Sequence, residues 1–116
     1  MTIDMTAQLE QAFLSLPRME REAIISYGVA VRLSGLRKRH FLAQSKIQAF
    51  EKKYGTTLAQ LDATGLPDDA GFEMHEDYIM WHHWQDVLET VTRDIAALEK
   101  IAAQGLCLKG VSHVGD

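Results

Sequence analysis

Apolar residues recur at alternating intervals of three and four along two long stretches of the chain. Spacing of this kind forms a heptad seam on an α-helix, and a period of two fits neither stretch. The pattern therefore predicts two long helices and no strands. The first seam comprises Val29, Leu33, Leu36, His40, Ala43, Ile47, Phe50 and Tyr54, with His40 as its polar member. The second comprises Trp81, Trp84, Leu88, Val91, Ile95, Leu98 and Ala102.

Helix-breaking and helix-capping residues set the expected boundaries. Pro17 separates a short N-terminal helix from the first long one, and Gly55 suits the left-handed position that ends a helix. Thr57 and Gln60 have the capping-box spacing that opens a short helix. Gly105 is expected to close the second long helix. The predicted order is a helix over 6–16, a long helix over 19–54, a short helix over 57–63, a loop over 64–72, a long helix over 73–104 and a tail over 105–116.

Two long helices of similar length, joined by a connection of about twenty residues, predict an antiparallel hairpin within a single all-α domain. The first long helix also carries a second apolar stripe, which one hairpin leaves uncovered. Either the N-terminal helix packs there through Leu9, Phe13 and Leu16, or a second subunit approaches at the glycines. We expect a homodimeric bundle. The stripe comprises Ile24, Gly28, Val31, Gly35, Leu42 and Ala49, with Phe41 beside it.

Charge is unevenly distributed along the 116 residues, whose formal net charge is −4. Residues 32–53 hold seven of the twelve basic residues and one acid, whereas residues 62–99 hold ten of the sixteen acids and one base. The two long helices can pair these charges with each other, in exposed contacts that each contribute only ~0.2–1 kcal/mol. Alternatively, each sign has its own external partner. Asp77, one turn before Trp81, is expected to cap its helix or to pair with Lys53 or Tyr54.

The basic stretch raises the possibility of a small nucleic-acid-associated regulator, because lysine and arginine neutralise phosphates. No helix-turn-helix and no interleaved aromatic residues accompany it, so this function stands as the alternative. The candidate phosphate contacts are Arg37, Lys38, Arg39, Lys46, Lys52 and Lys53.

Catalytic and cofactor signatures are missing from the sequence. No serine, nor the single Cys107, stands in a nucleophile motif, and there is no phosphate loop or dinucleotide fingerprint. His75 and His82 are seven residues apart, about 10 Å along a helix, and His83 adds no ligand spacing. We therefore expect no enzyme activity, no metal and no cofactor. Without an apolar run of ~18 residues or a leader, a cytoplasmic protein is expected.

Residues 40–100 contain short motifs in a characteristic order. Phe50-Glu-Lys-Lys-Tyr-Gly55 is followed by Leu58 and Leu61, then by Glu76-Asp-Tyr78 and Trp81. This order resembles small helical antitoxin-type proteins of bacterial and archaeal toxin–antitoxin cassettes. The resemblance implies a cognate toxin as partner, bound by the acidic loop and the start of the second long helix, and it implies no catalytic residues. The expected contact residues are Asp68, Asp69, Glu73, Glu76, Asp77 and Tyr78.

Overall fold

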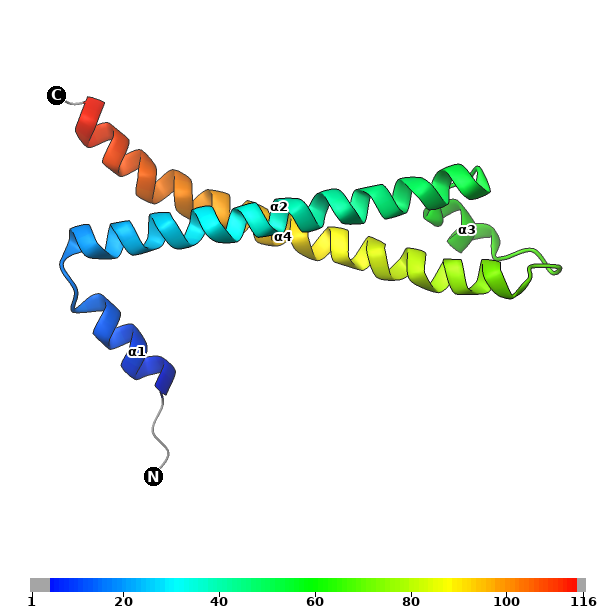
Figure 1. Ribbon diagram of the computed structural model, residues 1–116, viewed down its shortest axis with the longest axis horizontal. Helices are drawn as coiled ribbons and strands as arrows, with labels where there is room; N and C mark the ends of the chain where they lie inside the picture. The colour runs from blue at the N-terminus through cyan, green and yellow to red at the C-terminus, as the bar shows by residue number, and fades with distance from the viewer. Residues whose placement is uncertain (1–4, 115–116) are drawn as a thin grey trace. The chain divides into compact units, whose positions relative to one another are not determined.

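The computed structural model describes the backbone of residues 5–114 and the side chains as far as residue 104. This part of the chain is helical and contains no strand, which confirms the predicted all-α class (Figure 1). The helices are α1 (Met5–Leu14), α2 (Arg18–Tyr54), α3 (Leu58–Thr64) and α4 (Phe72–Val114).

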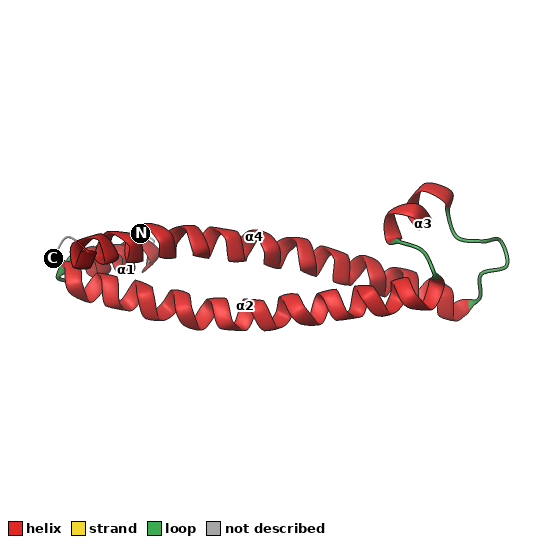
Figure 2. Ribbon diagram, turned by 90° about the horizontal axis from the view of Figure 1, so that it is seen from above, coloured by secondary structure: helices red, strands yellow, loops and turns green. Residues whose placement is uncertain are grey.

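The chain divides into two compact units, and both long helices run through both of them. We call Ser34–Ala96 the hairpin unit, and Met1–Leu33 with Ala97–Asp116 the terminal unit. In the hairpin unit, α2 and α4 pack against each other in antiparallel directions, as the heptad seams predict. Figure 2 shows α3 beside the ends of α2 and α4 that the connection joins.

Trp81 is at the centre of the hairpin-unit core. Its side chain is 0% exposed, and its ring stacks on Phe50 at 5.5 Å and on Tyr54 at 6.1 Å between centroids. The buried cluster joins all three helices of the unit, because Ile47 comes from α2 and Leu58 and Leu61 from α3. Antiparallel packing of the two seams therefore puts Phe50 of α2 against Trp81 of α4. The half-buried residues packed around this cluster are Phe50, Tyr54, Leu66, Met74, Tyr78, Trp84 and Leu88.

The predicted caps fix the connection between the long helices. Gly55 has a φ of +63°, and its N–H donates to the carbonyl of Glu51 at 2.8 Å, so α2 ends in a left-handed residue. The Gln60 N–H donates to Thr57 Oγ1 at 3.2 Å, while the Thr57 N–H donates to Gln60 Oε1 at 3.4 Å. This reciprocal capping box starts α3 as predicted.

Among the described residues outside this cluster, five of the six buried ones are seam positions. Leu36, Ala43 and Val91 are buried in the hairpin unit, and Val29 and Leu33 in the terminal unit. Val87 is buried as well, although it is not a seam position. The buried face of α4 is therefore wider than the two positions per heptad of a coiled-coil seam, as is usual for a helix in a globular core.

Two boundary predictions are wrong. Helix α1 ends at Leu14 rather than at residue 16, and α4 continues through Gly105 to Val114 instead of giving way to a tail. A glycine inside a helix costs only about 1 kcal/mol relative to alanine, so Gly105 between helix-forming neighbours does not end α4. The rest of the predicted tail, residues 115–116, lies outside the described residues.

The alternative in which the N-terminal helix packs on the stripe is not observed. None of the α1 residues is buried, and Leu9 is 71% exposed. One hydrogen bond from Arg21 Nη1 to the carbonyl of Leu14, at 2.8 Å, joins the end of α1 to α2. The apolar residues of this short helix therefore remain accessible rather than covering the stripe of α2.

Candidate functional site

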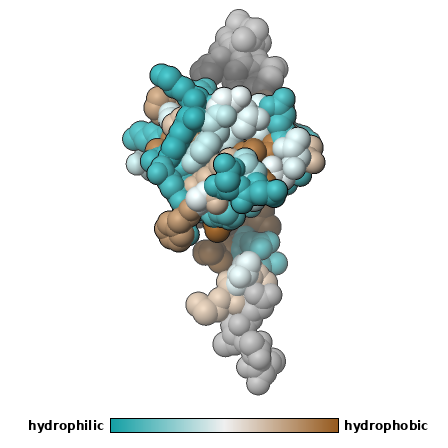
Figure 3. All heavy atoms as spheres, turned by 90° about the vertical axis from the view of Figure 1, so that its right-hand side faces the viewer, coloured by the Kyte–Doolittle hydropathy of each residue, from teal (hydrophilic) through white to brown (hydrophobic). Residues whose placement is uncertain are grey.

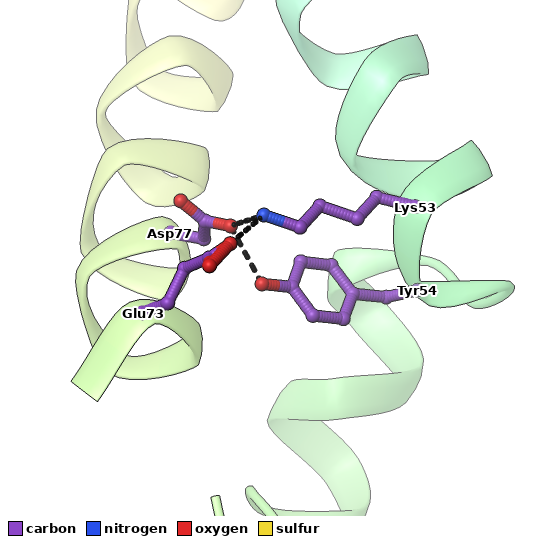
Figure 4. A network of polar contacts seen from close by, with 4 residues as sticks. All are labelled: Lys53, Tyr54, Glu73 and Asp77. Atoms are coloured by element: carbon purple, nitrogen blue, oxygen red, sulfur yellow. Dashed lines mark hydrogen bonds and ion pairs between the residues drawn. The ribbon is translucent and has the colours of Figure 1, made fainter. Parts of the chain in front are cut away.

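A four-residue polar network fastens the last turn of α2 to the first turns of α4 (Figure 4). Lys53 Nζ donates to Glu73 Oε2 at 2.5 Å and to Asp77 Oδ2 at 2.6 Å, and Tyr54 donates its hydroxyl to the same Asp77 oxygen at 2.6 Å. Glu73 and Asp77 share one face of α4 because they are four residues apart. The predicted pairing of Asp77 with Lys53 or Tyr54 is confirmed with both.

The network changes the acidity of its members. The hydrogen bonds from Lys53 and then Tyr54 hold the pKa of Asp77 below its ordinary value. Burial, followed by the hydrogen bond to Asp77, raises the pKa of the Tyr54 hydroxyl. The hydrogen bonds to Asp77 and Glu73 raise the pKa of the Lys53 ammonium. Each shift favours the protonation state found at neutral pH. The contacts that cause these shifts therefore help to hold α2 and α4 together at neutral pH.

A second polar network fastens α3 to α4. Asp62 Oδ1 accepts a hydrogen bond from the Tyr78 hydroxyl and lies 2.9 Å from His82 Nε2. The rings of Tyr78 and His82 meet edge to face with their centroids 4.8 Å apart. The hydrogen bonds from Tyr78 and then His82 lower the pKa of Asp62, and the hydrogen bond to Asp62 raises the pKa of Tyr78.

This second network is not predicted from the sequence, where Tyr78 belongs to the expected partner-contact residues and His82 to the histidines considered as metal ligands. Their spacing of four residues was a signal that they share one face of α4. Asp62 follows the buried Leu61 in α3, but nothing in the sequence fixes how α3 lies against α4, so its contacts were not predictable.

A polar groove lies beside this network, at the junction of α2, α3 and α4. Four carboxylates line it, and among its lining residues His82 is the only side chain that can become cationic. The groove therefore favours positively charged groups over anions. Its lining residues are Glu51, Thr57, Leu58, Ala59, Asp62, His82, Gln85, Asp86 and Glu89.

The six predicted partner-contact residues fall into two groups. Glu73, Asp77 and Tyr78 are engaged in the networks between helices. The side chains of Asp68, Asp69 and Glu76 are exposed, and within the described residues they form no ion pair. Figure 3 views this end of the hairpin and shows hydrophilic side chains surrounding smaller apolar patches.

Two apolar residues close to these acids in the sequence are exposed, and neither was among the predicted contact residues. Phe72 is 82% exposed and Ile79 is 61% exposed. Their spacing of seven, with Glu76 between them, puts all three on the face of α4 opposite the buried Trp81. The sequence signal for their exposure was that these apolar residues lie outside the heptad seam. We call Asp68, Asp69, Phe72, Glu76 and Ile79 the tip patch.

The basic residues considered for phosphate binding do not share one face of α2. Arg37, Lys38 and Arg39 are consecutive, so they are about 100° apart around the helix. Lys53 is bound to Glu73 and Asp77. Lys46 and Lys52 are exposed but lie on different sides of the helix. A phosphate backbone would therefore meet only a few of these charges at a time.

The histidines that were weighed as metal ligands make separate contacts. His75 Nδ1 lies 2.9 Å from the carbonyl of Gly71, and His83 meets the edge of Trp84. Within the described part of the chain, no three metal-binding side chains form a cluster. No described helix combines the length and the apolar character that crossing a bilayer requires.

A scan of protein-family models and searches of curated proteins and of solved structures yield no match for this chain. The function therefore has to be inferred from the chain's own residues.

Proposed function

We propose that the chain is a protein-binding module, specifically an antitoxin that neutralises a cognate toxin by occupying part of its surface. One observation carries this proposal: Phe72, 82% exposed, and Ile79, 61% exposed, lie two turns apart on one face of α4, with the exposed acid Glu76 between them. Large apolar side chains that remain exposed next to polar ones are typical of protein interaction sites.

The composition of the tip patch indicates the chemistry of the partner. Aromatic and aliphatic residues that fill pockets supply most of the free energy of binding at an interface, and the surrounding charges contribute specificity and association rate. Phe72 and Ile79 suit an apolar pocket, and Asp68, Asp69 and Glu76 suit basic residues around it. A toxin with basic residues around an apolar pocket would fit the composition of the tip patch.

The two polar networks support this assignment by limiting the motion of the patch. Lys53 and Tyr54 fix the first turns of α4 from one side, and Asp62 fixes the next turn from the other. A patch that is ordered before binding loses less conformational entropy when the complex forms. The two networks therefore position the part of α4 that carries Phe72 and Ile79, although neither residue belongs to a network.

The test begins with native purification of the tagged chain, identification of a stoichiometric protein and light scattering of the complex. The double variant Phe72→Ala/Ile79→Ala should then weaken the affinity at least tenfold, which corresponds to about 1.4 kcal/mol. Met19→Ala is the matched control, because Met19 is 81% exposed but lies on α2 in the terminal unit.

The acids of the tip patch are tested separately. Asp68→Asn/Asp69→Asn should slow association and reduce its salt dependence while the dissociation rate changes little. If the affinity survives both double variants while the fold is intact, the tip patch is not the contact surface. Toxicity of the co-purified protein in cells, relieved by the wild-type chain and not by Phe72→Ala/Ile79→Ala, would distinguish an antitoxin from another binding module.

A further inference from the structure

Four exposed basic side chains form two rows along α2 in the hairpin unit, outside the seam that packs on α4. Lys38 and Lys52, fourteen residues apart, form the first row. Arg39 and Lys46, seven residues apart, form the second row, about 100° further around the helix. Within the described residues, none of these four side chains forms an ion pair. Both rows therefore present positive charge that the hairpin unit does not neutralise.

Acidic side chains are nearly absent from this part of α2. Residues 34–54 contain six basic residues and one acid, Glu51, although the formal net charge of the chain is −4. Glu51 lines the groove between α2, α3 and α4 and does not lie between the two rows. This side of α2 therefore favours a negatively charged partner.

Small and apolar residues occupy the strip between the two rows. Gly35, Leu42 and Ala49 follow each other at intervals of seven, and all three are exposed. A Cβ atom added at Gly35 would meet no atom within 4 Å, so nothing from the same chain covers the strip there. The long basic side chains therefore project on both sides of a strip whose own side chains are short or apolar.

We propose that α2 of the hairpin unit binds double-stranded DNA by lying in the major groove, with one basic row along each of the two phosphate backbones that border it. An α-helix with its side chains is about 10–12 Å in diameter, and the major groove of B-DNA is about 12 Å wide. One backbone alone would meet a single row, whereas a groove brings a backbone to both sides of the helix. The spread of these charges around α2 therefore suits a groove.

The strip between the rows offers few groups that read bases. Leu42 and Ala49 can contact the methyl group of thymine, but their side chains neither donate nor accept a hydrogen bond. Ser45 donates its hydroxyl to the carbonyl of Phe41 at 2.8 Å, so this donor is already engaged. Phosphate contacts therefore dominate, and the affinity depends little on base sequence.

The salt dependence of binding tests the two rows. Fluorescence anisotropy of a labelled DNA duplex of mixed sequence, titrated with the full chain between about 50 and 200 mM salt, measures it. The slope of log K against log salt should be about −3.6, because each of four phosphate contacts contributes about −0.9. Lys38→Gln/Lys52→Gln should reduce the magnitude of this slope to about 1.8, since two contacts remain. Arg39→Gln/Lys46→Gln should have the same effect.

Arg93→Gln/Lys100→Gln is the matched control, because it removes two exposed basic side chains from α4. Its slope should equal that of the wild type, and circular dichroism should show the same helical content for all three double variants. Absence of binding at about 50 mM salt, or equal losses of slope in all three, would overturn the proposal. A loss confined to one row would show contact with a single backbone and would overturn insertion into a groove.

Obstructing one groove at a time tests where α2 binds. DNA whose cytosines carry a glucosylated hydroxymethyl group has an obstructed major groove and should bind at least about tenfold more weakly. Netropsin, which fills the minor groove of A·T sequences, should leave binding intact. An RNA duplex of the same sequence should bind more weakly than the DNA, because its deep, narrow major groove is not accessible to side chains. Equal affinity for the two duplexes, or displacement by netropsin, would contradict binding in the major groove.

DNA binding and partner binding are separate outcomes, because the basic rows are on α2 and the tip patch is on α4. Phe72→Ala/Ile79→Ala should leave the DNA affinity unchanged. Loss of DNA binding in this variant, with the helical content intact, would assign DNA contact to the tip patch and overturn the placement on α2.

Discussion

The hairpin unit and the terminal unit use similar residues in opposite ways. In the hairpin unit, Trp81 and Leu61 are enclosed by side chains from three helices of the same chain. In the terminal unit, Met5, Leu9 and Leu14 of α1 are between 61% and 76% exposed. The hydrophobic effect favours burial equally in both places. The difference shows that the residues around Trp81 are enclosed by their own chain, whereas the apolar residues of α1 are not.

The polar residues show the same contrast. In the hairpin unit, Asp77 and Asp62 each receive two polar contacts from a neighbouring helix. In the terminal unit, Arg18 and Glu22 form an ion pair 3.6 Å long within one helix. Contacts between helices fix their relative position, while an exposed pair within a helix contributes only a few tenths of a kcal/mol. In the hairpin unit, side-chain contacts between helices therefore help to fix how α2, α3 and α4 pack together.

The largest expected effect is the loss of Trp81. Trp81→Ala should lower the free energy of unfolding by about 3–5 kcal/mol, because it removes a fully buried side chain that contacts Phe50 and Tyr54. Met19→Ala, the control from the terminal unit, should change it by less than about 0.5 kcal/mol. Chemical denaturation followed by circular dichroism measures both. Equal losses would contradict the contrast between the two units.

Trp81→Phe sharpens this prediction. The indole N–H of Trp81 is buried and has no hydrogen-bond partner among the described residues, which opposes part of the stabilisation from burial. Phenylalanine keeps an aromatic ring against Phe50 and removes the unsatisfied donor. We therefore expect Trp81→Phe to cost clearly less than Trp81→Ala in the same denaturation experiment.

These contrasts explain what the sequence could and could not predict. The heptad spacing and the hairpin connection together indicate which residues of the two seams meet, and the stacking of Phe50 on Trp81 is one such contact. The pairing of Asp77 was predictable for the same reason. The Asp62 network was not, since it depends on how a seven-residue helix lies against α4. The exposure of Leu9 was not predictable, because its apolar side chain could be covered either by the same chain or by another molecule.

Glycine substitutions should act with opposite signs in the two units. Gly55→Ala should lower the free energy of unfolding by about 1–2 kcal/mol, because a φ of +63° is unfavourable for a residue with a Cβ atom. Gly28→Ala should raise it by up to about 1 kcal/mol, because alanine favours a helix and its Cβ would meet nothing in the same chain.

Thermal and denaturant unfolding of both variants provide the measurement. A loss of stability for Gly28→Ala, or no loss for Gly55→Ala, would contradict the opposite signs expected here.

A smaller effect is expected for Tyr54→Phe. This variant keeps the ring against Trp81 and removes the hydroxyl that donates to Asp77, so the free energy of unfolding should fall by about 1 kcal/mol. Tyr27→Phe is the control, because Tyr27 is 75% exposed in the terminal unit. If both variants cost the same, the Asp77 hydrogen bond does not stabilise the hairpin unit.

The smallest effect concerns pH, because the charged groups involved are largely exposed and screened by solvent. The pKa values of Asp62 and Asp77 are lowered from 3.8, so their stabilisation is present above about pH 4 and is lost as the pH falls further. The pKa values of Tyr54 and Tyr78 are raised from 10.0, so theirs is present below about pH 10 and is lost above it. Unfolding free energies measured across this range should form a plateau with two falling limbs. Asp62→Asn/Asp77→Asn should flatten the acid limb, and an unchanged acid slope would show that other carboxylates control it.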